Sequence, residues 1–420
     1  MKFSIVTFGC RVNQADSLAI EAMLRGAGGV ESAWSSADLV VVNTCSVTCS
    51  ADQGARQTIR RVARENPAAR IVATGCYATR RPQELGALPG VLGVVANDDK
   101  LDPGAWASSL DGVSTSERFG AGDGGCGAAL TPGVQGRTAF TLRVQTGCEE
   151  QCSYCIIPST RGRGRSVPVD RVVAEVGRIG ASGFKEIALT GVHLGSYGRD
   201  LTPAASLRDL LVALDALHLD VTFRVSSLEP MDCTGEIIDL VAASGGRFAP
   251  HFHLPLQHAS DRMLRLMRRP YTFAYYRGLV ERIVARMPHA SIGSDMIVGF
   301  PGETDADFAC SADYVAGSPL SHLHVFPYSD RPGTAASVLG DKVPGATVRE
   351  RGLRLRAIGQ ELSRRFRSAH TGTIRPGLTI DDGTAVVTDN FLKVRIPPGV
   401  VRNQRVSVRL LEGTAAVVVG

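Results

Sequence analysis

The sequence lacks three features that would place a protein in a class directly. No apolar run approaches the roughly 20 residues that span a bilayer. The opening residues, MKFSIVTFGC, lack the small-residue cleavage site of a secretory signal. A strong net charge is also missing, since 46 Lys and Arg against 41 Asp and Glu leave +5. We therefore expect a cytoplasmic protein with no membrane association, in which an anionic partner is permitted but not required.

The cysteines are the first clue to function. The chain has 420 residues, of which 44% are hydrophobic and 21% charged, as in ordinary soluble proteins of two or three domains. Its ten cysteines are poor candidates for a disulfide framework in the cytoplasm. Cysteines in that compartment more often serve as metal ligands or catalytic thiols.

The first hundred residues alternate apolar strands with helices. The helix after the first strand is expected to be capped by Asp16 or Ser17 and to end at Gly28, and a basic helix is expected at 50–65. Continuous apolar strands separated by helices predict a parallel sheet covered on both faces. The four expected strands are FSIVTFGC, ADLVVVNTC, ARIVATGC and VLGVVAND.

Three of these strands end at or just before a cysteine, namely Cys10, Cys45 and Cys76. The carboxyl ends of parallel strands meet at one edge of an open α/β sheet, where ligands bind. The three residues could be buried thiols, because free cysteine packs as a small hydrophobe. Three cysteines at equivalent positions in successive units favour a metal site instead.

A second α/β region follows from 138 to about 340. It has six apolar strands with helices between them, for example at 169–181, 205–217 and 303–316. This order predicts a partial or complete parallel (β/α) barrel, in which function collects at the carboxyl ends of the strands.

The remaining segments differ in composition. Residues 102–136, which include Cys126, are rich in Gly, Ser and Ala and read as a linker or a loosely ordered edge. A helix with seven arginines is expected at 346–368, and short alternating strands after it predict a small antiparallel β-barrel. The expected domains are 1–101, 102–136 as linker, 137–368 and 369–420.

The stretch TGCEEQCSYC places Cys148, Cys152 and Cys155 in a C-x3-C-x2-C spacing after the first barrel strand. A four-iron cluster normally has four cysteine ligands, and this stretch offers three. Either a fourth ligand lies elsewhere in the chain, or one iron is open to a small molecule.

This spacing resembles the radical S-adenosylmethionine (SAM) superfamily. The resemblance implies that SAM chelates the open iron and is cleaved to a 5′-deoxyadenosyl radical. It also implies SAM contacts at the ends of several barrel strands, although each glycine could be a tight turn and each Ser or Glu a solvated loop. The residues expected to contact SAM are Tyr154, Thr190, Gly191, Ser226, Ser227, Glu229, Gln257, Val298 and Gly299.

Nearly the whole chain resembles the methylthiotransferase family. The resemblance rests on FTLRVQTGCEEQCSYCIIPSTRGRGRS, HLPLQHASDRMLRLMRRPYT, DMIVGFPGE and FPYSDRPGT, in that order. It implies that Cys10, Cys45 and Cys76 hold a second 4Fe–4S cluster, so that all six cysteines are catalytic. It also implies that the C-terminal barrel is an RNA-binding TRAM domain.

Within the family, TFGCRVNQADS and VVNTCSVTCSADQGARQTIRR resemble the type that modifies N6-threonylcarbamoyladenosine in tRNA. That type implies methylthiolation of C2 at position 37, with two clusters and two SAM molecules. The implied partners are the tRNA anticodon stem-loop and an electron donor such as flavodoxin or ferredoxin; the sulfur donor stays unknown. The basic helices at 50–65 and 346–368 would contact phosphates, or else form a plain solvated surface.

Other interpretations remain open. The substrate could be isopentenyladenosine in tRNA or a ribosomal protein, and a non-catalytic RNA-binding protein with metal sites is an alternative of another class. Two features depart from the family pattern or are unexplained by it. His258 and Ala259 stand where the family usually has Ser-Gly, and Cys49, four residues after Cys45, is interpreted as a bystander.

Overall fold

The computed structural model describes residues 1–106 and 138–419, which form two compact units. Unit 1 takes in residues 1–106, 146–163 and 329–337, and unit 2 takes in 138–145, 164–328 and 338–419. Across these residues, no helix combines the length and apolar character needed to cross a membrane.

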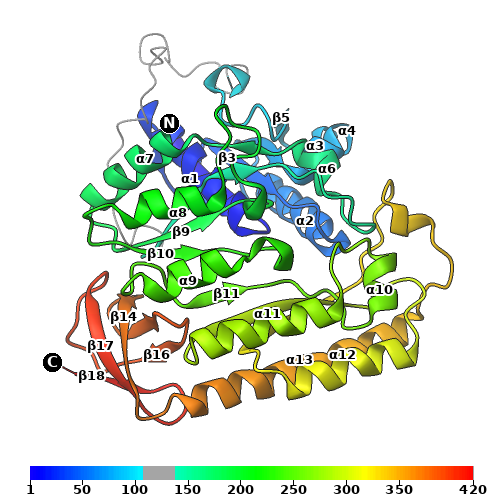
Figure 1. The fold of residues 1–420 in the computed structure, drawn as a ribbon. Helices are drawn as coiled ribbons and strands as arrows, with labels where there is room; N and C mark the ends of the chain where they lie inside the picture. The colour runs from blue at the N-terminus through cyan, green and yellow to red at the C-terminus, as the bar shows by residue number, and fades with distance from the viewer. Residues whose placement is uncertain (107–137, 420) are drawn as a thin grey trace. The chain divides into compact units, whose positions relative to one another are not determined.

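Unit 1 is built on a five-stranded parallel sheet in the order β2-β1-β3-β4-β5. Its strands are drawn in the blue and cyan part of the ribbon in Figure 1. The longer strands are continuous apolar runs, as expected for strands buried on both faces. Their bounds are Lys2–Thr7 for β1, Val30–Glu31 for β2, Leu39–Thr44 for β3, Arg70–Gly75 for β4 and Val91–Val95 for β5.

Helices cover both faces of this sheet. The helices are α1 (Arg11–Gly26), α2 (Cys49–Glu65), α3 (Cys76–Arg80), α4 (Pro82–Gly86) and α6 (Ile157–Arg161), with 3-10 turns at Trp34–Ser36 and Pro103–Trp106. Val40 and Val42 of β3 pack in one core with Ile59 of α2. Val41 packs in the other core with Leu24 of α1, because successive residues of a strand face opposite sides.

The expected start of the first helix is wrong. The helix α1 begins at Arg11, with Cys10 at its N-cap, and not at Asp16 or Ser17. Aspartate and serine are common helix caps. Here both side chains are buried and form hydrogen bonds with residues outside α1. Ser17 Oγ accepts hydrogen bonds from Thr7 and Asn43 at 2.8 and 2.9 Å, and Asp16 belongs to an ion-pair network described below.

The expected linker falls mostly outside the described residues. Cys126 lies there too. Residues 102–106 of the segment are described, and they belong to unit 1. Trp106 ends the 3-10 turn and is fully buried in the α1 side of the core, where its indole N–H donates to the carbonyl of Lys100 at 3.1 Å.

Unit 2 contains the expected six strands with helical crossovers, which confirms the partial parallel barrel. The strands pair as β10-β9-β6 and β11-β12-β13, and a parallel bridge from Phe223 to Phe248 links the two sheets. Their bounds are Phe140–Arg143 for β6, Glu186–Thr190 for β9, Thr222–Val225 for β10, His251–His253 for β11, Ser291–Val298 for β12 and His322–Pro327 for β13. The short strand β7 (Gln145–Thr146) follows β6, and the short strand β8 (Arg165–Ser166) comes after α6 and before α7.

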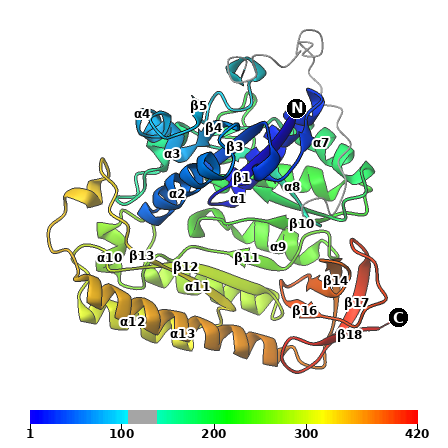
Figure 2. The same cartoon turned by 180° about the vertical axis from the view of Figure 1, so that it is seen from behind.

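The helices of unit 2 lie along the outer side of its strands (Figure 2). Several start at a side-chain cap, as at Ser206 and Thr304, where a capping box pairs each cap with an aspartate three residues on. The helices are α7 (Val169–Ala181), α8 (Leu207–Asp215), α9 (Gly235–Ala243), α10 (Asp261–Leu266), α11 (Phe273–Arg286), α12 (Asp305–Gly317) and α13 (Gly345–Ala369), with 3-10 turns at Leu194–Ser196 and Pro230–Asp232. A further 3-10 turn, Ala335–Val338, begins in the last segment of unit 1.

The C-terminal segment of unit 2 forms a curled five-stranded antiparallel sheet in the order β16-β15-β14-β17-β18. A bridge between Arg395 of β16 and Ala415, directly before β18, connects the two edges of this sheet. Its form agrees with the expected small β-barrel. The strands are β14 (Ile374–Ile380), β15 (Ala385–Thr388), β16 (Lys393–Arg395), β17 (Arg405–Leu410) and β18 (Ala416–Val419).

Candidate active site

The strand-end cysteines of unit 1 lie at the carboxyl edge of its sheet. Cys10 caps α1, Cys45 follows β3 directly, and Cys76 is the first residue of α3. Burial first, and then the charges of Cys10 and Cys76, raise the pKa of Cys45 to about 12, so the three thiols are near enough to influence one another. Gly9 is required beside them, because its φ is +95° and an added Cβ would lie 2.7 Å from Cys45 Sγ. Three thiols placed in this way have the donor chemistry of an iron–sulfur cluster.

The loop of Cys148, Cys152 and Cys155 also belongs to unit 1. All three thiols are half-buried, and the loop is held by main-chain hydrogen bonds, from Cys148 to Gly162 at 3.0 Å and from Cys155 to Cys152 at 3.1 Å. Gly147 starts the loop with φ +76°, and an added Cβ would lie 1.8 Å from the carbonyl oxygen of Arg163. Tyr154 is half-buried within the loop. The donor set again fits a cluster with three cysteine ligands.

A buried ion-pair network adjoins the strand-end cysteines. Arg161, six residues after Cys155, donates from Nη2 to Asn13 Oδ1 at 2.5 Å and to Asp16 Oδ2 at 3.0 Å. Burial disfavours its charge, but Cys76, Asp16 and Cys10 together raise the pKa of Arg161 above its ordinary value. A fixed positive charge therefore lies close to the thiolate ligands expected there.

Lys100 is the second cation of this network. It is fully buried, it pairs with Asp16, and its Nζ donates to Asn97 Oδ1 at 2.8 Å. Burial lowers the pKa of Lys100 to about 8, although Asp16 opposes that shift. The amide of Asn97 in turn lies 3.6 Å from Cys76 Sγ and donates to the carbonyl of Thr160 at 2.7 Å. The network thus connects the helix after the three-cysteine loop to the strand-end site.

Cys49 lies beside a second buried ion pair of unit 1. Its exposed Sγ accepts a hydrogen bond from Arg331 Nη1 at 3.4 Å. Arg331 pairs with Asp52 at 2.8 Å, and Arg80 pairs with the same carboxylate at 2.5 Å. These contacts give Cys49 a local structural role.

Two of the expected SAM-contacting residues lie at the end of strand β9 of unit 2, where Thr190 is the last residue of the strand and Gly191 follows it. Thr190 is buried, and an added Cβ on Gly191 would lie 3.0 Å from Gln145 Oε1. The same oxygen accepts the N–H groups of Val192 and His193 at 3.0 and 2.9 Å. Gln145, which the sequence analysis missed, therefore fixes the backbone of this turn.

The end of strand β10 carries an unsatisfied hydroxyl. Ser226 Oγ is buried and has no hydrogen-bond partner within the described part of the chain, whereas Ser227 is exposed. Leaving a buried hydroxyl unpaired costs free energy, so a ligand group at this position would be favoured. Glu229 nearby in sequence forms an ion pair with Arg269, and burial raises its pKa despite that partner. Both side chains suit the polar groups of SAM.

The expected residues on β12 and after β11 are held by backbone contacts. Gln257 adopts φ +67°, an uncommon conformation for a residue other than glycine, and its N–H donates to the carbonyl of Asp295 at 2.8 Å. Val298 is buried at the end of β12. Gly299 donates to Glu303 at 2.6 Å, and an added Cβ there would lie 2.4 Å from Val348 Cγ2. Gly299 is thus required for packing against α13, whatever it does for a ligand.

His258, a departure from the family pattern, is a fully buried structural residue. Its Nδ1 accepts the N–H of Ser260 at 3.0 Å, so the proton resides on Nε2, which faces Glu303 at 3.2 Å. Glu303 also receives a hydrogen bond from Arg351 Nη1 at 2.6 Å. The histidine belongs to the support of the loop that starts α12.

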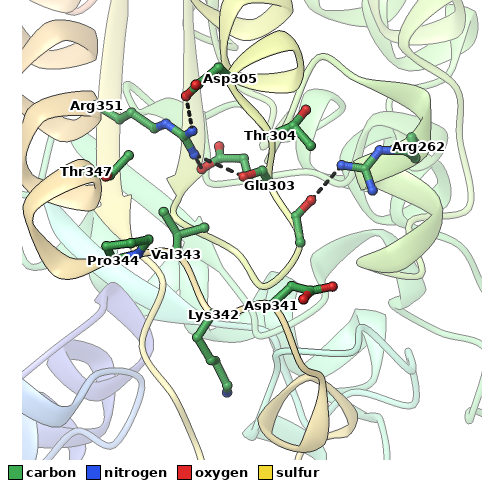
Figure 3. A pocket seen from close by; sticks show the side chains of 11 residues that line it. Arg262, Glu303, Thr304, Asp305, Asp341, Lys342, Val343, Pro344, Thr347 and Arg351 are labelled. Atoms are coloured by element: carbon green, nitrogen blue, oxygen red, sulfur yellow. Dashed lines mark hydrogen bonds and ion pairs between the residues drawn. The ribbon is translucent and has the colours of Figure 1, made fainter.

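A polar cavity of about 660 Å³ adjoins this loop (Figure 3). Arg351 points toward Glu303 and Asp305 along one wall, so its charge is neutralised within the protein. None of the residues expected to contact SAM lines the cavity. Its lining residues are Arg262, Gly302, Glu303, Thr304, Asp305, Asp341, Lys342, Val343, Pro344, Thr347 and Arg351.

Comparison with known proteins covers both halves of the chain. Residues 2–96 match the family described as uncharacterized protein family UPF0004, and residues 142–315 match the radical SAM superfamily. The threonylcarbamoyladenosine tRNA methylthiotransferase MtaB of Aquifex aeolicus is 36% identical over 94% of this chain and 96% of its own length. The ribosomal protein uS12 methylthiotransferase RimO of an Anaeromyxobacter species is 34% identical over 93% of this chain and 83% of its own length.

A solved structure shows a related fold. The radical SAM methyltransferase TsrM from Kitasatospora setae, with cobalamin and a 4Fe–4S cluster bound, aligns with a TM-score of 0.55 and 16% identity. The alignment covers 80% of this chain and 77% of that one. At this identity the likeness concerns the fold alone.

Proposed function

Because this chain belongs to the methylthiotransferase family of radical SAM enzymes, we propose that it methylthiolates C2 of N6-threonylcarbamoyladenosine at position 37 of tRNA. The observation that carries this substrate is the near full-length match to a relative named for it, at 36% identity. A relative named for ribosomal protein uS12 is 34% identical, so identity alone separates the two substrates weakly. A tRNA substrate would place the protein in the cytoplasm.

Two clusters and two SAM molecules are part of this proposal. Cys148, Cys152 and Cys155 would hold one cluster, and Cys10, Cys45 and Cys76 would hold the other. When bound, the first cluster and SAM supply the 5′-deoxyadenosyl radical, and the second cluster supplies the methylated sulfur. C2 of adenine carries no leaving group, so radical activation is what the substitution requires.

The chain's own residues would position these groups. The hydroxyl of Ser226 would donate a hydrogen bond to SAM, and the carboxylate of Glu229 would accept a hydrogen bond from SAM. Gln145 holds the turn after β9 in place, and Arg161 keeps a positive charge beside the thiolates of the second site. That charge lowers the electrostatic cost of gathering three thiolates there.

Exposed basic residues of unit 2 would contact tRNA phosphates of the anticodon stem-loop. Arg349 and Arg356 are exposed on α13, and Lys393 and Arg395 are exposed on β16. Arg351 is not available, because it is buried against Glu303 and Asp305. Phosphate contacts of this kind give affinity that falls with salt. Flavodoxin or ferredoxin would supply the electron.

The substrate is tested by mass spectrometry of tRNA nucleosides from a deletion strain. We expect the methylthio form of threonylcarbamoyladenosine to disappear and to return when the wild-type gene or Cys310→Ala is supplied, since Cys310 is an exposed thiol of α12. Cys148→Ala and Cys45→Ala should not restore it. An unchanged nucleoside would refute the proposal, and loss of the methylthio group from an isopentenyladenosine or from a ribosomal protein would identify the alternative.

The number of clusters is tested separately by anaerobic reconstitution. Wild type should bind about eight irons per chain and form 5′-deoxyadenosine on reduction. A variant with Cys10, Cys45 and Cys76 changed to alanine should keep about four irons and continue to cleave SAM. An iron content that does not change in this variant would refute the second cluster.

A further inference from the structure

Histidines are concentrated on one face of the sheet β11-β12-β13 in unit 2. His251 and His253 lie on β11, and His322 and His324 lie on β13. The central strand contributes Asp295 between them. Neither cysteine site includes any of these residues, and the methylthiotransfer chemistry proposed above assigns them no role.

Strand register explains why the side chains converge. Gly293 pairs with both His253 and His322, and Asp295 pairs with His324 two residues further along. Residues two apart on a strand share a face, so Asp295 points to the same side as the two imidazoles. An added Cβ on Gly293 would lie 2.0 Å from His322 Nε2, so glycine at this position makes room for an imidazole over the sheet.

This face is the inner face of the strand layer. Leu323 lies against α13, since an added Cβ on Gly359 of that helix would lie 3.1 Å from Leu323 Cβ. Its neighbours His322 and His324 therefore point away from the helix, toward the interior of the partial barrel.

Three potential ligand atoms lie close together here. His253 Nε2 is 2.9 Å from Asp295 Oδ1, and His324 Nδ1 is 3.1 Å from the same oxygen. All three atoms lie within 4.8 Å of one another. Ligands at right angles on a metal ion with bonds of about 2.1 Å would be about 3.0 Å apart, so a metal ion fits with little movement.

We propose that His253, Asp295 and His324 form a binding site for a divalent transition-metal ion such as Mn²⁺, Fe²⁺ or Zn²⁺. Two imidazoles and one carboxylate are a set that binds such ions and leaves coordination positions open. Metal binding would replace the two imidazole protons that now face the carboxylate. The proposal does not depend on the tRNA substrate.

The exposure of the three ligands indicates where the open positions lie. The side chain of His253 is 10% exposed, that of Asp295 23% and that of His324 57%. The site is therefore closed by protein beneath His253 and open to solvent beside His324. An oxygen ligand, from water or from a carboxylate of a bound molecule, could reach the ion from that side.

The test is a titration of the untagged, reconstituted holoenzyme with Mn²⁺, followed by electron paramagnetic resonance. At room temperature protein-bound Mn²⁺ gives a broadened spectrum and oxidised 4Fe–4S clusters give none, so the sharp six-line spectrum reports free Mn²⁺. We expect about one tight Mn²⁺ site per chain, which Zn²⁺ displaces. Asp295→Asn and His324→Ala should each weaken Mn²⁺ binding by about 100-fold or more, because each removes a ligand.

Two controls keep the result interpretable. His218→Ala removes an exposed histidine elsewhere in unit 2 and should leave the titration unchanged. Iron content and formation of 5′-deoxyadenosine should be equal in wild type and variants, which shows that a loss of Mn²⁺ binding is not a loss of fold. Wild type that binds neither Mn²⁺ nor Zn²⁺ more tightly than Asp295→Asn would overturn the proposal. The three residues would then form a hydrogen-bonded group only.

Discussion

The buried amine of Lys100 should make the free energy of unfolding of unit 1 depend on pH, by an amount that can be calculated from its pKa. Burial lowers its pKa from the ordinary 10.5 to about 8. Between these values the unfolded chain binds more protons at Lys100 than the folded chain does, so the free energy of unfolding rises as the pH rises from 8 toward 10.5. A shift of about 2.5 units at 1.36 kcal/mol each corresponds to roughly 3 kcal/mol over the whole window. Lys100→Met should remove this slope.

Tryptophan fluorescence is a suitable assay because both tryptophans, Trp34 and Trp106, belong to unit 1. Urea midpoints of the full chain would be measured anaerobically from pH 7.5 to 10. We expect wild type to gain stability with pH relative to Lys100→Met. Lys185→Met, which changes a partly exposed lysine of unit 2, should behave as wild type. The reasoning would fail if Lys100→Met kept the wild-type slope, since the slope would then arise from other groups.

Three further changes test other parts of the structure. Gly147→Ala would place a Cβ 1.8 Å from the Arg163 carbonyl oxygen, so the reconstituted protein should lose about half its iron; a normal iron content would contradict this. Ser226→Ala should weaken SAM binding about tenfold in equilibrium dialysis, while Ser227→Ala should not; equal effects would argue against the assigned contact. Asp307→Asn should lower the free energy of unfolding by about 1 kcal/mol at pH 7. Burial would raise the pKa of Asp307, but hydrogen bonds from Arg262 and from Thr304, the N-cap of α12, hold that pKa well below its ordinary range. The wild-type advantage should therefore shrink below about pH 4 in thermal melts, and an advantage that persists there would refute the assignment.

The strands and many helices could be predicted because their signals are local. The helix expected at 169–181 is present with those bounds, and the helix expected at 346–368 extends by one residue at each end. The three strand-end cysteines were found because each apolar run ends at one. Such patterns depend only on residues close together in the chain.

The partners of the buried charges could not be predicted, because they are distant in sequence. Asp16 meets Lys100 84 residues later and Arg161 145 residues later. Asp16 was expected to cap a helix because aspartate often does so, and these distant contacts explain why it lies inside α1 instead. The sequence shows two His-x-His patterns, at 251–253 and 322–324, in which the histidines share one face of a strand. Their proximity to Asp295 depends on strand register, which a single sequence does not fix.

The composition of unit 1 has a consequence for protein synthesis. This unit takes residues from three separate parts of the chain, the last of them at 329–337. The carboxylate of Asp52 accepts a hydrogen bond from Arg331, which lies 279 residues later in the chain. A ribosome therefore completes the N-terminal sheet, with Lys100 beside Asp16 and Arg80 beside Asp52, long before it supplies the further partners of these two carboxylates, Arg161 and Arg331. A fragment ending at residue 101 would keep Arg80 and Lys100 but neither Arg161 nor Arg331. The strand-end cysteines thus reach their final surroundings only after most of the chain has emerged, and cofactor loading of that site would be a late step in the maturation of the protein.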